Sequence, residues 1–190
     1  MGPRRHPASM VIRAAEIRDA DAIGVVHVRA LQVAYRGVMP DEYLDGLVAE
    51  ERSSIWRDRI SLTHLPPLMV ADLAGELVGF AVFGAERPGP DESGAGELYA
   101  INLDPLHWGK GIGRALLRDA TATLAGLGFG EAILWVVPEN ARARSLYESE
   151  GWTTDGGLAR DQVLGVTVNE IRYRRSLIGC PAARGAEHPC

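Results

Sequence analysis

A glycine-rich turn constrains the fold of this chain more than any other feature. The segment 108–114 reads Trp-Gly-Lys-Gly-Ile-Gly-Arg, between a predicted strand at 97–103 and the clearest predicted helix, at 111–127. One face of that helix carries Ile112, Leu116, Ala120, Leu124 and Leu127. Glycine permits a tight turn, and free N–H groups at a helix N-terminus attract anions. The sequence therefore predicts a phosphate-binding turn between a strand and a helix.

Two common nucleotide motifs do not fit this turn. A dinucleotide fingerprint counted from Gly109 requires glycine at position 114, where the chain has Arg114. A P-loop requires serine or threonine after its lysine, but Gly111 follows Lys110. A glycine-rich loop without any ligand is the remaining alternative for this segment taken by itself.

The order of hydrophobic patterns predicts a mixed α/β fold. Helices are expected near 19–37, 40–47, 52–60, 111–127 and 140–149, and strands at 10–16, 68–73, 76–84, 97–103, 131–137 and 166–174. Ala74-Gly75 predicts an antiparallel hairpin, whereas helices between the later strands predict a parallel pair. The predicted class is α/β (α+β): one domain at 10–175, with a mixed central sheet and helices on both faces. Flexible arms are expected at 1–9 and 176–190.

Composition narrows the classes of function. A net charge of −5 argues against a nucleic-acid partner and suits a cationic substrate. No apolar run approaches the roughly 20 residues that span a bilayer, and no signal peptide is evident, so we expect a cytoplasmic protein without a membrane partner. The five histidines are scattered and both cysteines lie in the last eleven residues, so we expect no metal site.

Three motifs together resemble the GCN5-related N-acetyltransferase (GNAT) superfamily, over about residues 10–175. Its pattern Arg/Gln-x-x-Gly-x-Gly/Ala is matched by Gly111 and Gly113, with Trp108 at the Arg/Gln position. Residues 140–147 resemble the motif Asn-x-x-Ala-x-x-x-Tyr, and 101–103 match the strand that pairs with the pantetheine arm. The resemblance implies a splayed strand pair, acetyl-CoA as co-substrate and an N-acetyltransferase acting in a ternary complex. The cofactor-binding residues it implies are Ile101, Asn102, Leu103, Trp108, Gly109, Lys110, Gly111, Ile112, Gly113, Arg114, Asn140 and Arg144.

Acetyl transfer to an amine requires a base, because an ammonium has no lone pair, and an acid for the departing thiolate. Glu97 is the expected base: it occupies the place of the base glutamate in histone-acetylating relatives, and alternation puts it on the face of Tyr99, Ile101 and Leu103. A solvated glutamate, or one that only orders a water, is the alternative. Tyr147 is the expected acid, with a core tyrosine as its alternative.

The acceptor is the least constrained part of the prediction. Tyr35, Tyr43 and Tyr99 are the candidate substrate-binding residues. The acceptor can be a small-molecule amine or a peptide amine, and a homodimer is open. A second function from another class is a non-catalytic acyl-CoA-binding sensor with the same fold.

Overall fold

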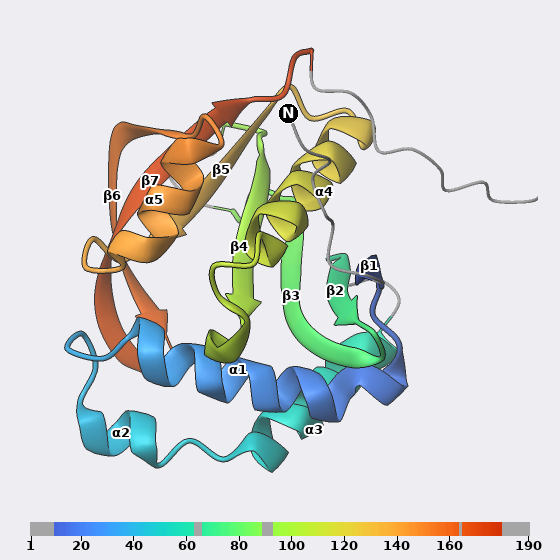
Figure 1. Cartoon of the computed structure of the whole chain (residues 1–190). Coiled ribbons are helices and arrows are strands. Elements are labelled where there is room, and N and C mark those ends of the chain that lie inside the picture. Colours follow the sequence, from blue (N-terminus) through green and yellow to red (C-terminus); the bar gives the residue numbers. More distant parts are fainter. Residues whose placement is uncertain (1–9, 63–65, 89–92, 164, 180–190) are drawn as a thin grey trace, which may run out of the picture.

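A seven-stranded mixed sheet forms the centre of the molecule (Figure 1), in the order β1-β2-β3-β4-β5-β7-β6. The computed structural model describes residues 10–62, 66–88, 93–163 and 165–179. The strands are β1 Met10–Ala14, β2 Leu68–Leu73, β3 Glu76–Ala85, β4 Gly96–Leu103, β5 Glu131–Val136, β6 Thr153–Val163 and β7 Val166–Ser176. The helices are α1 Ala20–Ala34, α2 Asp41–Asp45, α3 Ala49–Ser61, α4 Ile112–Gly126 and α5 Ala141–Ser149, with short 3-10 turns at Ile17–Asp19 and Pro105–His107. The expected arm at 1–9, most of the expected tail and both cysteines lie outside the described residues.

The pairing of β4 with β5 is the feature that positions the site. These strands are parallel, as predicted, but only three residue pairs join them, ending at Leu98↔Leu134. Beyond this point the two strands separate. Every other neighbouring pair in the sheet is antiparallel, and the β2–β3 hairpin turns at Ala74 and Gly75, which both have positive φ. The predicted splayed strand pair and mixed sheet are confirmed.

Helices cover both faces of the sheet, as predicted. On one face α4 packs its apolar stripe, including Leu116 and Leu124, against Ala81, Phe83 and other residues of the sheet. On the other face, α1 and α3 pack against β2 and β3. Figure 1 shows α4 and α5 lying over the near side of the sheet while α1 crosses below the open end of β4. The N-terminus of α4 and the gap between β4 and β5 therefore face the same region of the molecule.

A β-bulge in β4 changes one expectation. Val82 pairs with Ala100 and Phe83 with Leu98, so Tyr99 is the extra residue in the ladder. A bulge interrupts strict alternation, and the face of β4 that packs toward α4 accordingly holds Leu98 and Ile101. The prediction that Glu97 shares a face with Ile101 and Leu103 is therefore wrong, because the bulge was not visible in the sequence.

Strand β6, Thr153–Val163, is not among the strands predicted from the sequence. It is an edge strand whose side chains are mostly exposed, and Gly156 and Gly157 interrupt it. Without a buried face it lacks the apolar alternation that identifies a strand. Directly after β7, buried Leu177 donates its N–H to the Gly130 carbonyl at 2.9 Å.

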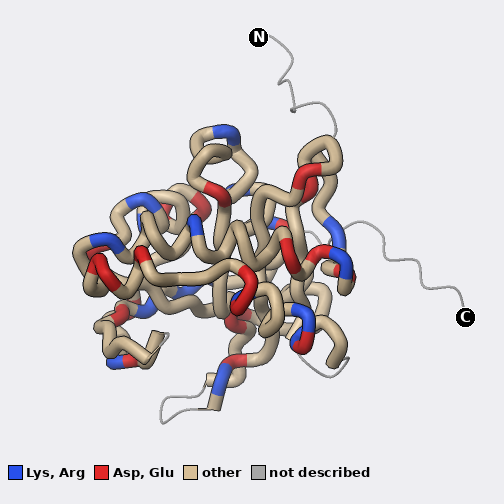
Figure 2. Tube along the Cα trace, turned by 90° about the horizontal axis from the view of Figure 1, so that it is seen from below, with Lys and Arg blue, Asp and Glu red and all other residues tan. Residues whose placement is uncertain are grey.

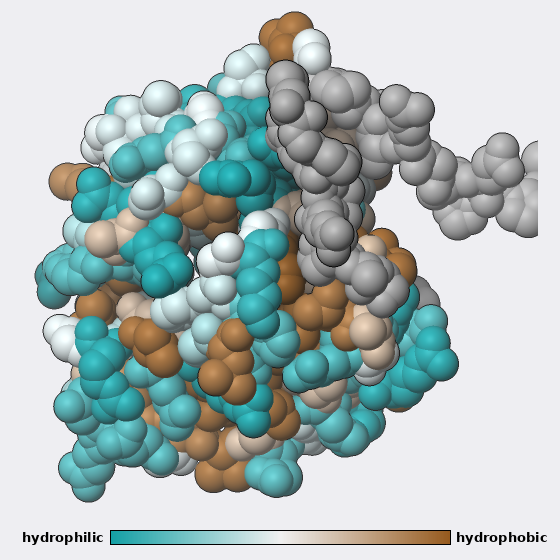
Figure 3. All heavy atoms as spheres, in the orientation of Figure 1, coloured by the Kyte–Doolittle hydropathy of each residue, from teal (hydrophilic) through white to brown (hydrophobic). Residues whose placement is uncertain are grey.

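The surface shows no obvious segregation of charge or hydrophobicity in the views drawn. Figure 2 shows Lys and Arg interspersed with Asp and Glu along the chain. The apolar side chains on the face seen in Figure 3 lie scattered among hydrophilic ones. Among the described residues, none of the helices is long and apolar enough to cross a membrane.

Close packing of α1 on α3 gives a stability prediction with a matched control. A Cβ at Gly24 would lie 2.7 Å from the Ser53 backbone nitrogen and 2.8 Å from the Ala49 carbonyl oxygen, so Gly24→Ala must move α3. We expect a loss of about 1–3 kcal/mol in the free energy of unfolding, measured by urea denaturation. Gly126→Ala, in α4 with nothing within 4 Å of the new Cβ, should instead stabilise by about 0.4–1 kcal/mol. Equal effects of the two substitutions would contradict the packing seen here.

Candidate active site

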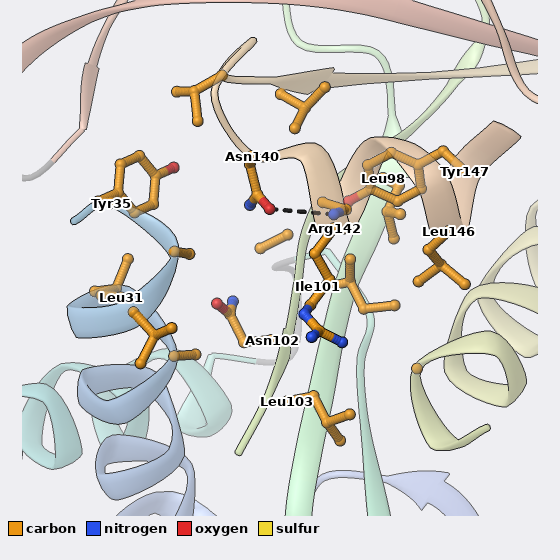
Figure 4. A pocket seen from close by; sticks show the side chains of 18 of the residues that line it. Leu31, Tyr35, Leu98, Ile101, Asn102, Leu103, Asn140, Arg142, Leu146 and Tyr147 are labelled. Atoms are coloured by element: carbon orange, nitrogen blue, oxygen red, sulfur yellow. Dashed lines mark hydrogen bonds between the residues drawn. The ribbon is translucent and has the colours of Figure 1, made fainter. Parts of the chain in front are cut away.

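A cavity of about 1190 Å³ runs from the N-terminus of α4, through the gap between β4 and β5, to the β6–β7 hairpin. Figure 4 shows the side chains that meet in it from α1, β4 and α5. Its lining joins residues far apart in sequence, from Tyr35 to Glu170. The volume suits a ligand larger than a typical small metabolite.

The turn before α4 has the geometry of an anion-binding site. Gly109 and Gly111 have φ of 75° and 81°, the left-handed region that glycine adopts without strain, and Gly111 caps the helix. The first N–H groups of α4 have no acceptor within the helix, and no side chain of the described residues caps them. Gly113 does not have a positive φ, and a Cβ at this position would make only an ordinary contact with Leu146, at 3.6 Å. The predicted glycine turn thus presents free backbone donors to the cavity.

The cationic side chains near this turn differ from those expected. Arg114 lines the cavity, but its Nε lies 2.8 Å from Glu150, and Lys110 does not line the cavity. Arg142, which is not among the predicted cofactor-binding residues, lines the cavity with its guanidinium 4.3 Å from the centre of the Trp108 ring. Its place on the first turn of α5 could have suggested this, since that turn follows the strand beside the gap.

Arg144, expected at the cofactor, lies outside the cavity lining. It donates to the Pro138 carbonyl at 3.0 Å and to the Tyr173 hydroxyl at 3.2 Å, and it approaches Glu148 at 4.0 Å. These contacts hold α5 against β7. Arg144 thus contacts residues of the scaffold, whereas Arg142 lines the cavity.

The strand gap exposes backbone groups of β4 to the cavity. Ile101, Asn102 and Leu103 all line it and have no partner on β5. The indole Nε1 of Trp108 donates to the Leu103 carbonyl at 3.1 Å, which fixes the ring beside the gap. Opposite, the Asn140 Oδ1 accepts the Ala143 N–H at 3.1 Å and caps α5, and its amide also lines the cavity (Figure 4). Asn140 can therefore cap α5 with its oxygen and still present its amide to a ligand in the cavity.

Tyr147 lies where α5 meets the middle of the cavity. It is buried, and Figure 4 shows its hydroxyl pointing into the cavity. Among the described residues, none forms a hydrogen bond with this hydroxyl. Burial, followed by the nearby Tyr35 and Glu170, raises the pKa of Tyr147, so the phenol stays protonated at neutral pH. A protonated, unpartnered phenol can donate to a ligand.

Glu97, the predicted base, is held by Arg87 instead of facing the cavity. Its carboxylate accepts the Arg87 N–H and Nε–H, each at 2.8 Å, with Arg87 NH2 at 2.7 Å. The side chain is 1% exposed and does not line the cavity, whereas Arg87 does. Both oxygens accept charge-assisted hydrogen bonds from Arg87, and the carboxylate does not reach the cavity, so Glu97 is not placed to take a substrate proton. Its geometry is that of a residue that positions Arg87.

Glu170, on β7, is a cavity residue that was not predicted from the sequence. Its side chain lines the cavity, it is 8% exposed, and no hydrogen bond or ion pair within the described chain reaches its carboxylate. Burial, together with the neighbouring Asp161, raises the pKa of Glu170 to about 7. The available signal was a lone carboxylate alternating with Val166 and Val168 on one face of the last strand.

The three tyrosines predicted to bind the acceptor substrate differ in their position relative to the cavity. Tyr35, at the end of α1, lines the cavity with its pKa raised by burial and by Glu170 to about 12. Tyr99 also lines it, while its hydroxyl donates to the Ala85 carbonyl and its ring lies under Arg87. Tyr43 lies outside the lining and packs with a small cluster around Leu44. No group of three metal-ligating side chains occurs in the described part of the chain.

Comparison with known proteins identifies relatives of this chain. A model of the acetyltransferase (GNAT) family matches residues 28–152. A Bacillus subtilis protein named "Uncharacterized N-acetyltransferase YuaI" is 35% identical over 132 residues, which are 69% of this chain and 73% of that protein. The Mycobacterium tuberculosis protein "Probable N-acetyltransferase Rv2775" is 27% identical over 173 residues, covering 88% of this chain and 94% of the other.

The fold has counterparts among solved structures. The structure of yncA from Salmonella typhimurium with its cofactor acetyl-CoA superposes with a TM-score of 0.65 at 24% identity, over 96% of this chain and 100% of that one. At this identity the likeness concerns the fold, and the family match rests on sequence. The glycine turn, the splayed strands and the matched residues 28–152 together place this chain in the acetyltransferase (GNAT) family.

Proposed function

We propose that this protein transfers an acetyl group from acetyl-CoA to an amine by direct attack in a ternary complex. One observation carries the proposal: a single cavity joins the free amides of α4, the gap between β4 and β5, and an end lined by Asp161 and Glu170. Those three parts match a diphosphate, an extended thiol arm and a cationic amine. The names of the relatives and the acetyl-CoA in the yncA structure support the same reaction.

The donor would bind along the first two parts of the cavity. The N-terminal amides of α4 would hold the diphosphate of CoA, with Gly109 and Gly111 shaping the turn. The pantetheine arm would lie in the strand gap and form strand-like hydrogen bonds with the backbone at 101–103, while the Asn140 amide contacts it from α5. The thioester would then lie near Tyr147.

The reaction would proceed at the point where the strand gap meets the acceptor end. Holding the amine beside the thioester removes most of the entropic cost of their encounter. An unpaired backbone N–H of β4 near Ile101 would stabilise the oxyanion, and the Tyr147 hydroxyl would donate a proton to the departing sulfur. The alternative, a non-catalytic acyl-CoA sensor, needs neither a buried phenol nor a carboxylate at the far end of the cavity.

The direct test is turnover with a panel of primary amines. We expect the purified protein to release CoA thiol from acetyl-CoA at a rate that depends on the amine added, and mass spectrometry to detect the N-acetylated product. Thiol release would be followed with a chromogenic thiol reagent. Tight CoA binding by calorimetry with no amine-dependent thiol release across the panel would favour the sensor.

Arg142 is expected to contribute to CoA affinity, and Arg144 is not. Removing a charge-assisted contact with a phosphate through Arg142→Ala should weaken CoA binding about tenfold by calorimetry. Arg144→Ala changes the same residue type on the same helix but outside the cavity, so its CoA affinity should stay near that of the wild type. The opposite ranking would show that the cavity has been assigned to the wrong arginine.

Tyr147→Phe removes only the hydroxyl that points into the cavity. We expect kcat to fall about 100-fold, since general acid catalysis contributes at least that much, with little change in CoA affinity. A steady-state assay together with calorimetry separates the two effects. An unchanged kcat would mean that Tyr147 is a core residue and that the thiolate leaves without its help.

A further inference from the structure

We propose that Glu170 is the general base that takes the proton from the acceptor, and that Asp161 beside it makes this end of the cavity a subsite for an ammonium group. The proposal rests on the acetyl transfer proposed above and assigns its second substrate a charge. It replaces Glu97, the base expected from the sequence, with a residue of a different strand.

The β6–β7 hairpin brings the two carboxylates together on the face that lines the cavity. Asp161 pairs with Val168, and Glu170 lies two residues beyond Val168 on the same face of β7. Diagonal neighbours of this kind lie within reach of long side chains. Both residues line the cavity, as do Tyr35 and Arg87.

Three carboxylates lie around Arg87 at this end of the cavity, and they differ in the hydrogen bonds that they already accept. Both oxygens of Glu97 accept hydrogen bonds from Arg87. Asp161 is 43% exposed and lies 3.5 Å from Arg87 NH1. Glu170 is 8% exposed and accepts no hydrogen bond from any described residue. A buried carboxylate without a partner carries a desolvation cost that a bound ammonium would relieve. Of the three, Glu170 is therefore the one that is both buried and available.

The charges around Glu170 favour a cation. Arg87 supplies one positive charge against the three carboxylates Glu97, Asp161 and Glu170, which leaves two negative charges when all are ionised. The other nearby groups do not change this balance. Tyr35 and Tyr147 stay neutral at pH 7, and Arg36, Arg172 and Arg174 are paired with carboxylates of their own.

The pKa of Glu170 suits a group that must take up a proton and release it again in each catalytic cycle. Burial and the like charge of Asp161 raise its pKa to about 7, so at physiological pH it can both accept a proton and release it. In the step, Glu170 removes one proton from the ammonium, and the nitrogen lone pair forms the C–N bond with the acetyl carbon. The C–S bond breaks with its electron pair moving to sulfur, which takes the proton of Tyr147. The second nitrogen proton restores the phenol, and Glu170 releases its own proton to solvent.

The test compares the pH profile of kcat/KM for the wild type, Glu170→Gln and Glu97→Gln, with the amine that turns over fastest in the panel. We expect the wild type to gain activity with rising pH through an apparent pKa near 7, because only ionised Glu170 accepts a proton. Glu170→Gln should lower kcat/KM about 100-fold and lose this inflection. Glu97→Gln should keep the inflection. Asp161→Asn should move it to lower pH, because the like charge beside Glu170 is gone, and should raise KM for the amine.

A second acceptor distinguishes a base from a residue that only shapes the cavity. A fluorinated analogue of the same amine has a less basic nitrogen and arrives more often as the neutral amine. The ratio of wild-type to Glu170→Gln activity should therefore shrink with the analogue, since the base is then needed less. A ratio that does not change would reduce Glu170 to a positioning residue.

The pH dependence of folding stability tests the ionisation of Glu170 without any catalytic turnover. Burial raises the pKa of Glu170 from 4.5 to about 7, so between these values the folded protein holds a proton that the unfolded chain has lost. Folding stability contributed at this site therefore decreases as pH rises from 4.5 to 7. The Tm of Glu170→Gln relative to the wild type should accordingly increase between pH 5 and pH 8.

The outcomes separate this proposal from the proposed function. An active wild type whose rate and inflection survive Glu170→Gln but vanish in Glu97→Gln would return the base to Glu97 and overturn the assignment. A Tm difference that does not depend on pH would overturn the buried, unpartnered state of Glu170. A wild type that acetylates no amine would overturn the proposed function itself, and the role of Glu170 in that reaction with it.

Discussion

The separation of β4 from β5 after Leu98↔Leu134 is the feature on which the rest of the site depends. Two parallel strands that stayed paired would bury the backbone groups of 99–103 in the sheet and close the cavity. The sheet divides the core between α4 on one face and α1 with α3 on the other, and the bulge at Tyr99 lies where β4 begins to separate from β5. The tip of α4 and the start of α5 then lie on either side of one opening.

The same opening explains the distribution of charge. Free amides of α4 and Arg142 give one end a positive character, suited to a phosphate group. Glu97, Asp161 and Glu170 around Arg87 give the other end a negative one. Tyr147 lies between them with its hydroxyl unpaired within the described chain. A polarity of this kind orients an anionic cofactor and a cationic acceptor toward each other from opposite ends.

Features with strong local signals were predictable from the sequence. The glycine turn, the amphipathic α4 and the hairpin at Ala74 and Gly75 depend on residues close in the chain, and all were found. The polar edge strand β6 and the bulge at Tyr99 have no such signal. A side chain's role also depends on the residues, distant in sequence, that it contacts. This holds for Arg142 and Arg144, and for Glu97 and Glu170. Only the tertiary structure shows that Arg87 donates hydrogen bonds to Glu97 and that Glu170 has no hydrogen-bond partner among the described residues.

The most direct measurement is a crystal structure of the protein with CoA. The account predicts the diphosphate on the N-terminal amides of α4, the pantetheine arm between β4 and β5, and the sulfur beside the Tyr147 hydroxyl. The open space beyond the sulfur should then lead to Glu170. CoA bound elsewhere, with the strand gap left empty, would contradict the account.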